Sequence, residues 1–396
     1  MALLINASPN PGHKTIGSVL DKMAAIDVDN YITAMIIKKG AIDLRTACVL
    51  AHAETAFQPA SQAEPDLKTR DVSWNEWYHD NFSTPSTHKH LFVFSRRDLD
   101  QMLPIFDISS ERRHVTRSRA VFNEEEMFYA MCRFLSSNGT LFHSARDMGR
   151  QIPHMSDAIN DCVDRLYAEW CVPLLNNGML MWADRCELWA EAVTRKTGVD
   201  GNTICYVDGT TLEIARPTKG QRACFDGHHR AHDFILQGLK APCGLMPNLQ
   251  PPREGRRHDA YNMTCSGVDN DFEMLERETN KRWTCYGDPA YYGFPPYILH
   301  GYKDQPGTAA DDLLWSQDMN HGRVCVEWGF GRVEALWKKL TDRRQLRVFK
   351  SPIGKYYHVA AFLTNCFICL HGDQTTSYFH CAPPTLRNYL ARAHRN

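Results

Sequence analysis

The sequence predicts a mixed α/β fold behind an all-helical N-terminal region. Short β-rich runs alternate with helical periodicity between residues 202 and 390, whereas the apolar residues of 124–197 recur only at helical spacing. A hydrophobic content of 43% and a charged content of 23% are typical of a globular protein with a sizeable core. We therefore expect a poorly defined arm over 1–71, a helical region over 72–198 and an α/β domain over 199–396.

The chain before residue 124 offers few structural signals. Ile16–Ile26 and Ala41–Phe57 have the composition of helices, and the polar, proline-containing Gln58–Asp66 is typical of a linker. Two further polar stretches, Ser83–His88 and Ser109–Phe122, are expected as loops. We find no residues with an evident chemical role within 1–71.

Three predicted helices over 124–170 have the outline of a helix-turn-helix. Glu124–Leu135 has acids in its first turn, Thr140–Met148 follows as a short helix, and Ser156 is expected to cap the third. In DNA-binding proteins the last helix of such a unit lies in the major groove. Acids rather than a basic face mark this one: Asp157, Asp161 and Asp164. A scaffold that only braces the next domain therefore remains an equal alternative.

The α/β part predicts three strands, a helical crossover, a further strand and a long helix. In chain order the predicted elements are the strands Thr203–Asp208, His232–Gln237 and Gly244–Asn248, the helices Asp259–Cys265 and Asp271–Thr279, the strand Trp283–Gly287 and the helix Gly322–Leu340.

Three acids stand out along this order. Asp208 lies in a Val-Asp-Gly-Thr run, Asp288 in Gly-Asp-Pro-Ala-Tyr-Tyr, and Glu327 in Val-Glu-Trp-Gly-Phe-Gly. Each motif alone is weak, because an apolar run ending in Asp-Gly is also typical of a strand followed by a turn. Together they would place two carboxylates at neighbouring strand ends and a third on a packed helix.

These motifs, in this order, resemble the PIF/Harbinger-type DDE transposases, also described as the DDE superfamily endonuclease group. The resemblance is closest to versions from fungi and oomycetes. It extends to three further segments, Lys350–Tyr357, Leu363–Cys366 and Pro383–Leu386. It is good from Asn202 to Leu390, vague over Leu91–Cys171 and absent earlier. The family has an RNase H-like catalytic domain, which agrees with the order of elements.

The resemblance implies divalent-metal-dependent cleavage of DNA phosphodiester bonds, followed by strand transfer. Asp208, Asp288 and Glu327 would then be both the catalytic residues and the ligands of two Mg²⁺ or Mn²⁺ ions. Carboxylate oxygens suit such hard cations, and a pair of ions can activate the attacking oxygen and stabilise the leaving one. By themselves, the carboxylates indicate only metal-assisted phosphoryl transfer.

Three further residues are candidates for supporting roles. Arg323 precedes Glu327 by one helical turn, so it is expected to pair with Glu327 without metal or to contact a DNA phosphate. A plain surface salt bridge between the two is the structural alternative. His258 and Asp259 match a His-Asp pair of the resembling family. Asp259 would either support the metal ligands or, as we favour, cap the next helix.

The cysteines do not predict a zinc site. Cys366 and Cys369 have suitable spacing, with His371, His380 and Cys381 following, but both thiols lie in an apolar helical run. Reduced cysteines in the core are the simpler interpretation of most of the 14 in the chain. No zinc is expected.

The net charge and the hydropathy of the chain indicate which partners it can have. A net charge of −1 argues against a uniformly basic DNA-binding surface, although short basic runs occur. No signal peptide is evident, and the longest apolar run, Val359–Leu370, is about half of the ~20 residues that a membrane helix needs. We therefore expect a soluble, intracellular protein with no membrane partner.

The resemblance implies the remaining partners. They are transposon terminal repeats and target-site DNA, a separate Myb-like DNA-binding protein, and a second copy of the chain in a homo-oligomer. It also implies a nuclear location, although no localisation signal is visible. The alternative function is a domesticated, catalytically silent DNA-binding or scaffold protein that kept the fold; an unrelated hydrolase would need another metal site.

Overall fold

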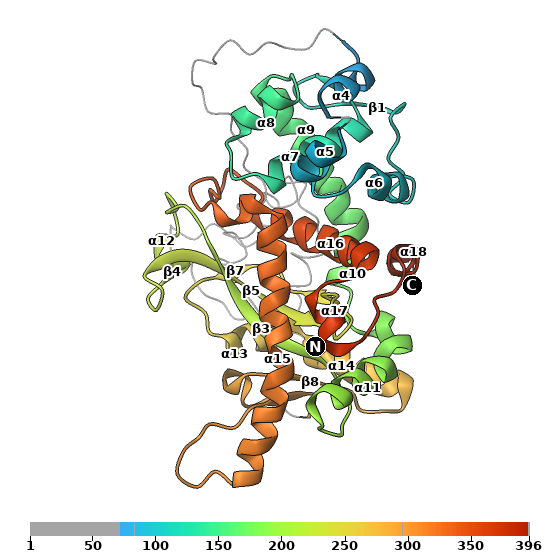
Figure 1. The fold of residues 1–396 in the computed structure, drawn as a ribbon. Helices are drawn as coiled ribbons and strands as arrows, with labels where there is room; N and C mark the ends of the chain where they lie inside the picture. Colours follow the sequence, from blue (N-terminus) through green and yellow to red (C-terminus); the bar gives the residue numbers. More distant parts are fainter. Residues whose placement is uncertain (1–71, 83, 295, 395–396) are drawn as a thin grey trace, which may run out of the picture.

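The computed structural model describes residues 72–394 except 83 and 295 (Figure 1). The helices and the linker that the sequence predicts before residue 72 lie outside the described part.

The described chain begins with a helical region that carries one small hairpin. Its helices are α4 (Trp74–Phe82), α5 (Pro85–Phe92), α6 (Arg96–Met102), α7 (Glu124–Ser136), α8 (Leu141–Asp147), α9 (Ile152–Leu166), the π-helical turn η1 (Tyr167–Cys171), α10 (Val172–Leu175), the 3₁₀ helix η2 (Leu180–Arg185) and α11 (Cys186–Thr197). Strands β1 (Arg113–Val115) and β2 (Val121–Asn123) pair antiparallel.

Three local predictions in this region are wrong. Ser83–His88 is not a loop, because Pro85 opens α5, where its missing N–H and fixed φ suit the first turn. Ser109–Phe122 contains β1 and most of β2. The third helix, α9, begins at Ile152, so Ser156 is a buried residue of the helix rather than its cap.

The rest of the chain builds a mixed sheet flanked by helices. Its strands are β3 (Thr203–Glu213), β4 (Phe225–Asp226), β5 (Ala231–Lys240), β6 (Asn248–Leu249), β7 (Arg253–Glu254), β8 (Thr284–Gly287) and β9 (Ile298–His300). Its helices are α12 (Gln221–Cys224), α13 (Asp259–Ser266), α14 (Val268–Thr279), η3 (Pro289–Tyr291), α15 (Ala310–Leu336), η4 (Lys338–Thr341), α16 (Ile353–His371), α17 (Gln374–Phe379), α18 (Leu386–Leu390) and η5 (Ala391–His394).

The sheet has the order β4-β5-β3-β8-β9, and β6 and β7 add to the edge of β5. β3 pairs antiparallel with β5 and parallel with β8, and β8 is parallel to β9. This mixed sheet behind a helical region confirms the predicted fold class and is consistent with an RNase H-like domain.

Helices cover the two faces of the β3–β5 ladder. On one face the Tyr206 hydroxyl lies so close to Gly322 of α15 that a Cβ there would be 1.8 Å away, and Phe330 of α15 lies against Gly238. On the other face Gln237 contacts Met263 of α13, with Nε2 3.8 Å from Sδ. Figure 1 shows the long helix α15 lying over the sheet that contains β3 and β5. Because strand side chains alternate, even-numbered residues here face α15 and odd-numbered ones face α13.

Two predicted boundaries near the acids change. β3 continues from Asp208 to Glu213, because β5 pairs with it residue by residue and Asp208 lies opposite Gly238. Asp208-Gly209 is therefore the interior of a strand and not a turn. The long helix begins at Ala310 and ends at Leu336 rather than spanning Gly322–Leu340. The predicted strand Gly244–Asn248 is largely a turn before β6.

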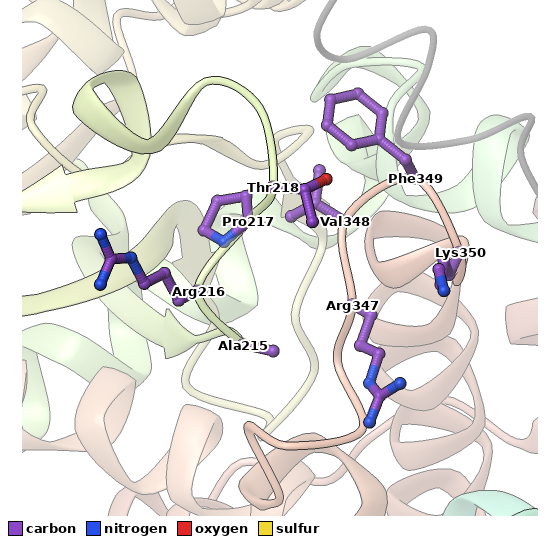
Figure 2. Close-up of a pocket in the computed structure, with 8 residues that line it drawn as sticks. All are labelled: Ala215, Arg216, Pro217, Thr218, Arg347, Val348, Phe349 and Lys350. Carbon is purple, nitrogen blue, oxygen red and sulfur yellow. The ribbon is translucent and has the colours of Figure 1, made fainter.

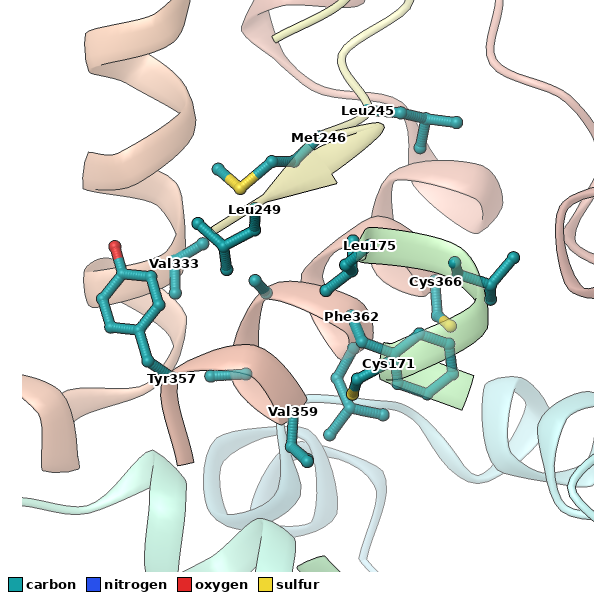
Figure 3. Packing of buried hydrophobic residues seen from close by; sticks show 14 of the residues in the cluster. Cys171, Leu175, Leu245, Met246, Leu249, Val333, Tyr357, Val359, Phe362 and Cys366 are labelled. Atoms are coloured by element: carbon teal, nitrogen blue, oxygen red, sulfur yellow. The ribbon is translucent and has the colours of Figure 1, made fainter. Parts of the chain in front are cut away.

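The apolar core joins α16 to the sheet and to the helical region. Figure 3 shows Cys171, Leu175, Phe362 and Cys366 packed together, with Leu249 of β6 nearby. Burial raises the pKa of the Cys366 thiol well above its usual value, so the thiol stays protonated. No helix in the described part of the chain is both long and apolar enough to cross a membrane.

Candidate active site

Asp208 lies within β3, and Asp288 directly follows β8, the parallel neighbour of β3. Tyr206 of β3 is in register with Tyr286 of β8, and each aspartate follows two residues later. Tyr286 donates from its hydroxyl to Asn320 of α15 over 3.0 Å, so this face of β8 also looks toward α15. Asp288 is held at the start of η3, where its Oδ1 accepts the Ala290 N–H over 2.9 Å. The Asp208 carboxylate thus belongs to the face that α15 covers, and Asp288 follows the end of the neighbouring strand at the same level.

Arg323 connects Glu327 to this pair. Its Nη1 lies 2.6 Å from Asp208 Oδ2, and its Nη2 lies 3.2 Å from Glu327 Oε1. The Asp208 side chain is only 18% exposed, whereas that of Glu327 is 56% exposed. Arg323 therefore makes the ion pair with Glu327 expected for the metal-free protein, and it bridges the strand acid to the helix acid.

Asp259 approaches from the opposite face. Its carboxylate lies against Gly209, where an added Cβ would be 2.7 Å from Asp259 Oδ1. The preferred prediction that Asp259 caps α13 is wrong: His258 occupies the cap position and Asp259 is the first helical residue. Only a glycine beside Asp208 leaves room for this carboxylate, so Gly209 has a steric role that the strand-and-turn interpretation missed.

The electrostatics of these acids favour a bound cation. Burial, opposed by Arg323 and the Gly209 N–H and reinforced by the charges of Asp288 and Asp259, raises the pKa of Asp208 to about 6. Burial and then Asp288 also raise the pKa of Asp259, which His258 lowers. Like charges are thus concentrated where Arg323 supplies one compensating cation. A divalent ion would offset the remainder, and carboxylate oxygens suit Mg²⁺ or Mn²⁺.

The three predicted ligands do not form the most compact set of ligand atoms in the described part of the chain. Among the described residues, only one set of His, Cys, Asp or Glu brings three ligand atoms within 4.8 Å of one another, and that set is Asp226, His229 and Asp233. The donor chemistry of Asp208, Asp288 and Glu327 fits a hard cation, and in this structure Arg323 occupies the position between Asp208 and Glu327. No role as a ligand is established for these three, and their assignment remains a prediction.

Two tyrosines beside Asp288 have features that sequence reasoning did not assign. Tyr291 is fully buried, and its ring packs so closely on Gly287 that a Cβ there would lie 2.5 Å from Cδ2. Within the described residues the Tyr291 hydroxyl has no hydrogen-bond partner. Tyr292 is 76% exposed, the most exposed of the large apolar side chains described. Both lie in the motif around Asp288, but only the fold separates the buried ring from the exposed one.

A basic cavity of about 470 Å³ lies beyond the end of β3. Figure 2 shows Arg216 on the loop after β3 and, across the hollow, Arg347 and Lys350 on the segment after η4. The two loops are joined where the Ala215 N–H donates to the Leu346 carbonyl oxygen over 2.9 Å. From the sequence, the basic runs are predicted only as candidate surface patches. The cavity itself could not be predicted, because it forms between segments that are distant along the chain.

The acidic side chains of α9 make contacts with other parts of the same chain. Asp157 accepts the Ser118 N–H over 2.9 Å, Asp161 lies 2.9 Å from His114, and Asp164 lies 3.1 Å from the Lys355 ammonium. This face of α9 therefore contacts the β1–β2 hairpin and α16. DNA reading by the 124–170 unit stays a prediction.

Comparison with known proteins places the acids within one family signature. Residues 207–365 match the family model described as DDE superfamily endonuclease, a span that includes Asp208, Asp259, Asp288 and Glu327. No curated protein and no solved structure matches the chain. The match supports nuclease or transposase activity in general, and it does not distinguish subtypes.

Proposed function

We propose that this chain is a transposase of the PIF/Harbinger type, which cleaves DNA phosphodiester bonds with divalent metal and then transfers the cut strand. The observation that carries the proposal is that Arg323 of α15 pairs with both Asp208 and Glu327, while the β3–β8 register places Asp288 level with Asp208. The similarity of residues 207–365 to the DDE superfamily endonuclease model supports the same reaction class.

In this proposal the protein contributes rigid and movable ligands. β3 fixes Asp208, and the first turn of η3 fixes Asp288, so two carboxylates are positioned in advance. Glu327 is more exposed and completes the set from α15. Two Mg²⁺ or Mn²⁺ ions, when bound, would supply a nucleophilic oxygen and stabilise the leaving one. Arg323, released from the carboxylates, would then be free to contact a DNA phosphate.

Two surface features support contact with DNA. Tyr292, exposed in the motif that contains Asp288 and in ring contact with His300, is suited to stack on a base. The cavity beyond β3 offers Arg347 and Lys350 to a phosphate backbone, whereas the Arg216 guanidinium points away from them and donates to Gln221 (Figure 2). The contacts with terminal-repeat and target-site DNA are proposed to run over Tyr292, Arg347 and Lys350.

The remaining partners are proposed from the family resemblance. A net charge of −1 leaves little general attraction for DNA, which supports reliance on a separate Myb-like protein. A homo-oligomer and a nuclear location belong to the same proposal.

The decisive experiment is cleavage of terminal-repeat DNA with Mg²⁺ or Mn²⁺, comparing wild type with Asp288→Asn. We expect this nearly isosteric change to abolish cleavage while DNA binding persists. Asp304→Asn, a change in an exposed loop, is the matched control and should cleave like wild type.

Other outcomes separate the alternatives. If wild type and Asp288→Asn bind DNA equally and neither cleaves, even with a Myb-like partner, the protein is a domesticated binder. Cleavage by Asp288→Asn at the wild-type rate would contradict the assigned carboxylates.

A further inference from the structure

The turn between β4 and β5 brings two aspartates and a histidine together, away from the candidate active site. Asp226 ends β4, His229 lies in the turn, and Asp233 is the third residue of β5. Their ligand atoms all lie within 4.8 Å of one another. The turn is ordered by Asp226, whose Oδ1 accepts the N–H of His228 over 2.7 Å.

Asp233 is the residue that the protein alone does not satisfy. Its side chain is 1% exposed, and neither carboxylate oxygen has a hydrogen-bond partner within the described residues. A buried carboxylate without partners is costly and is normally compensated by a cation or by donors. This carboxylate is aimed at the Asp226–His229 pair.

The neighbouring strand is shaped around the same carboxylate. A Cβ on Gly255, the residue after β7, would lie 1.6 Å from Asp233 Oδ1. The Gly255 N–H donates to the Asp233 backbone oxygen over 3.1 Å, which fixes the two segments together. A side chain at position 255 would therefore displace the carboxylate, and glycine keeps it in place.

A protonated His229 does not fully account for the arrangement. Its Nδ1 lies 2.8 Å from Asp226 Oδ2, which is a hydrogen-bonded pair, but 3.8 Å from Asp233 Oδ2. The imidazole thus serves one carboxylate and leaves the buried one beyond hydrogen-bond distance. A cation placed among the three ligand atoms would contact both carboxylates and the ring nitrogen.

We propose that Asp226, His229 and Asp233 bind a first-row transition-metal dication, with Zn²⁺ the ion to test first, which fastens the β4–β5 turn to the sheet. One imidazole and two carboxylates favour such an ion over Mg²⁺ or Ca²⁺, which prefer all-oxygen sites. His229 is 50% exposed, so an ion can enter from its side and a water can complete a four-coordinate site.

This site is separate from the candidate active site. Asp233 faces α13, whereas Asp208 faces α15, because the two differ in parity along an uninterrupted antiparallel register. Gly238, opposite Asp208, is five residues from Asp233, or ~17 Å along β5. The proposed ion therefore has a structural role and departs from the expectation that the protein binds no zinc.

The test uses the full chain, freed of metal with a chelator and kept reduced, with excess Mg²⁺ present to occupy the all-oxygen site. We expect one equivalent of Zn²⁺ to raise the melting temperature by about 4 °C near saturation. Co²⁺ should give the intense visible bands of four-coordinate cobalt without a thiolate charge-transfer band.

Matched variants locate the ion. His229→Gln, at a half-exposed position where folding is not at risk, should lose both the Zn²⁺ response and the Co²⁺ bands, and Asp233→Asn should do the same. His228→Gln, in the same turn but outside the cluster, should keep both. An unresponsive wild type, an unaffected His229→Gln, an equal loss in His228→Gln or a cobalt–thiolate band would each overturn the proposal.

Discussion

Two acidic clusters share the β3–β5 ladder but face opposite sides of it. The cluster of Asp208, Asp288 and Glu327 contains Arg323 as an internal cation and has one acid that is 56% exposed. The cluster around Asp233 has a half-exposed histidine, but its central carboxylate is 1% exposed and, within the described residues, without hydrogen-bond partners. The first cluster therefore holds its own compensating cation, whereas the second has none in contact with its buried carboxylate.

The two clusters differ in how the buried negative charge of their aspartate is compensated, and not in the pKa of that aspartate. Burial, with a smaller contribution from neighbouring carboxylates, raises the pKa of both Asp208 and Asp233 to about 6. Arg323 opposes the shift at Asp208 by direct contact over 2.6 Å, but at Asp233 the histidine stands 3.8 Å away. In our proposal Arg323 gives way to metal and DNA at the first cluster. At the second cluster, the Asp233 carboxylate packs against Gly255 and cannot rearrange. Four experiments test this contrast.

The largest expected effect separates the two glycines. Gly255→Ala should lower the free energy of unfolding by about 2–4 kcal/mol, because its Cβ would meet both the Asp233 carboxylate and the Asp233 backbone oxygen. Gly209→Ala should cost less stability, since only the mobile end of Asp259 obstructs it, yet it should slow cleavage by about 10²-fold through displaced acids. Chemical denaturation and cleavage assays measure the pair. Equal stability losses would remove the contrast between a rigid and an adaptable cluster.

Tyr292→Ala tests whether only the first cluster adjoins DNA. We expect about tenfold weaker binding of a DNA end with an unpaired flank, because stacking contributes about 1–3 kcal/mol per base. Tyr292→Phe keeps the ring and should bind like wild type. Fluorescence anisotropy measures both, and unchanged affinity in the alanine variant would show that the exposed ring is not a DNA contact.

Arg323→Gln tests the internal cation. Removing a charge 2.6 Å from Asp208 should tighten Mn²⁺ binding to the DNA-free protein about fivefold, roughly the 1 kcal/mol expected of a partly exposed charge. The Zn²⁺ response of the second cluster should not change. Calorimetric titration of each ion gives the comparison; weaker Mn²⁺ binding in the variant would mean that Arg323 organises the ligands rather than occupying their place.

The smallest expected effect concerns the basic cavity near the second cluster. Lys350→Gln should weaken DNA binding evenly across sequences and reduce the slope of log K against log salt by about 1. Lys281→Gln is the control, since Lys281 pairs with Glu187 over 2.9 Å. An unchanged slope would show that Lys350 does not contact a DNA phosphate.

Particular residues show which parts of the candidate active site could be predicted from the sequence. Asp208, Asp288, Glu327 and Arg323 could be named because their motifs are local in the chain. Asp259 was named, but its approach through Gly209 was not, because that contact joins α13 to the middle of β3. Tyr291 and Tyr292 are adjacent in the chain, and nothing local distinguishes the buried from the exposed ring.

The sequence by itself determined the fold class, since the change from helical to strand periodicity near residue 202 reflects which faces must be buried. It also determined the acids of the candidate active site. Only the tertiary structure decided the length of β3, the bridging place of Arg323 and the isolation of Asp233. The physical reason is that strand register, charge compensation and burial all depend on a segment distant in the sequence. β5 pairs with β3 and so extends it, and α15 supplies Arg323 to Asp208. The residue after β7, Gly255, packs against the Asp233 carboxylate, which nothing in the sequence distinguishes from other aspartates.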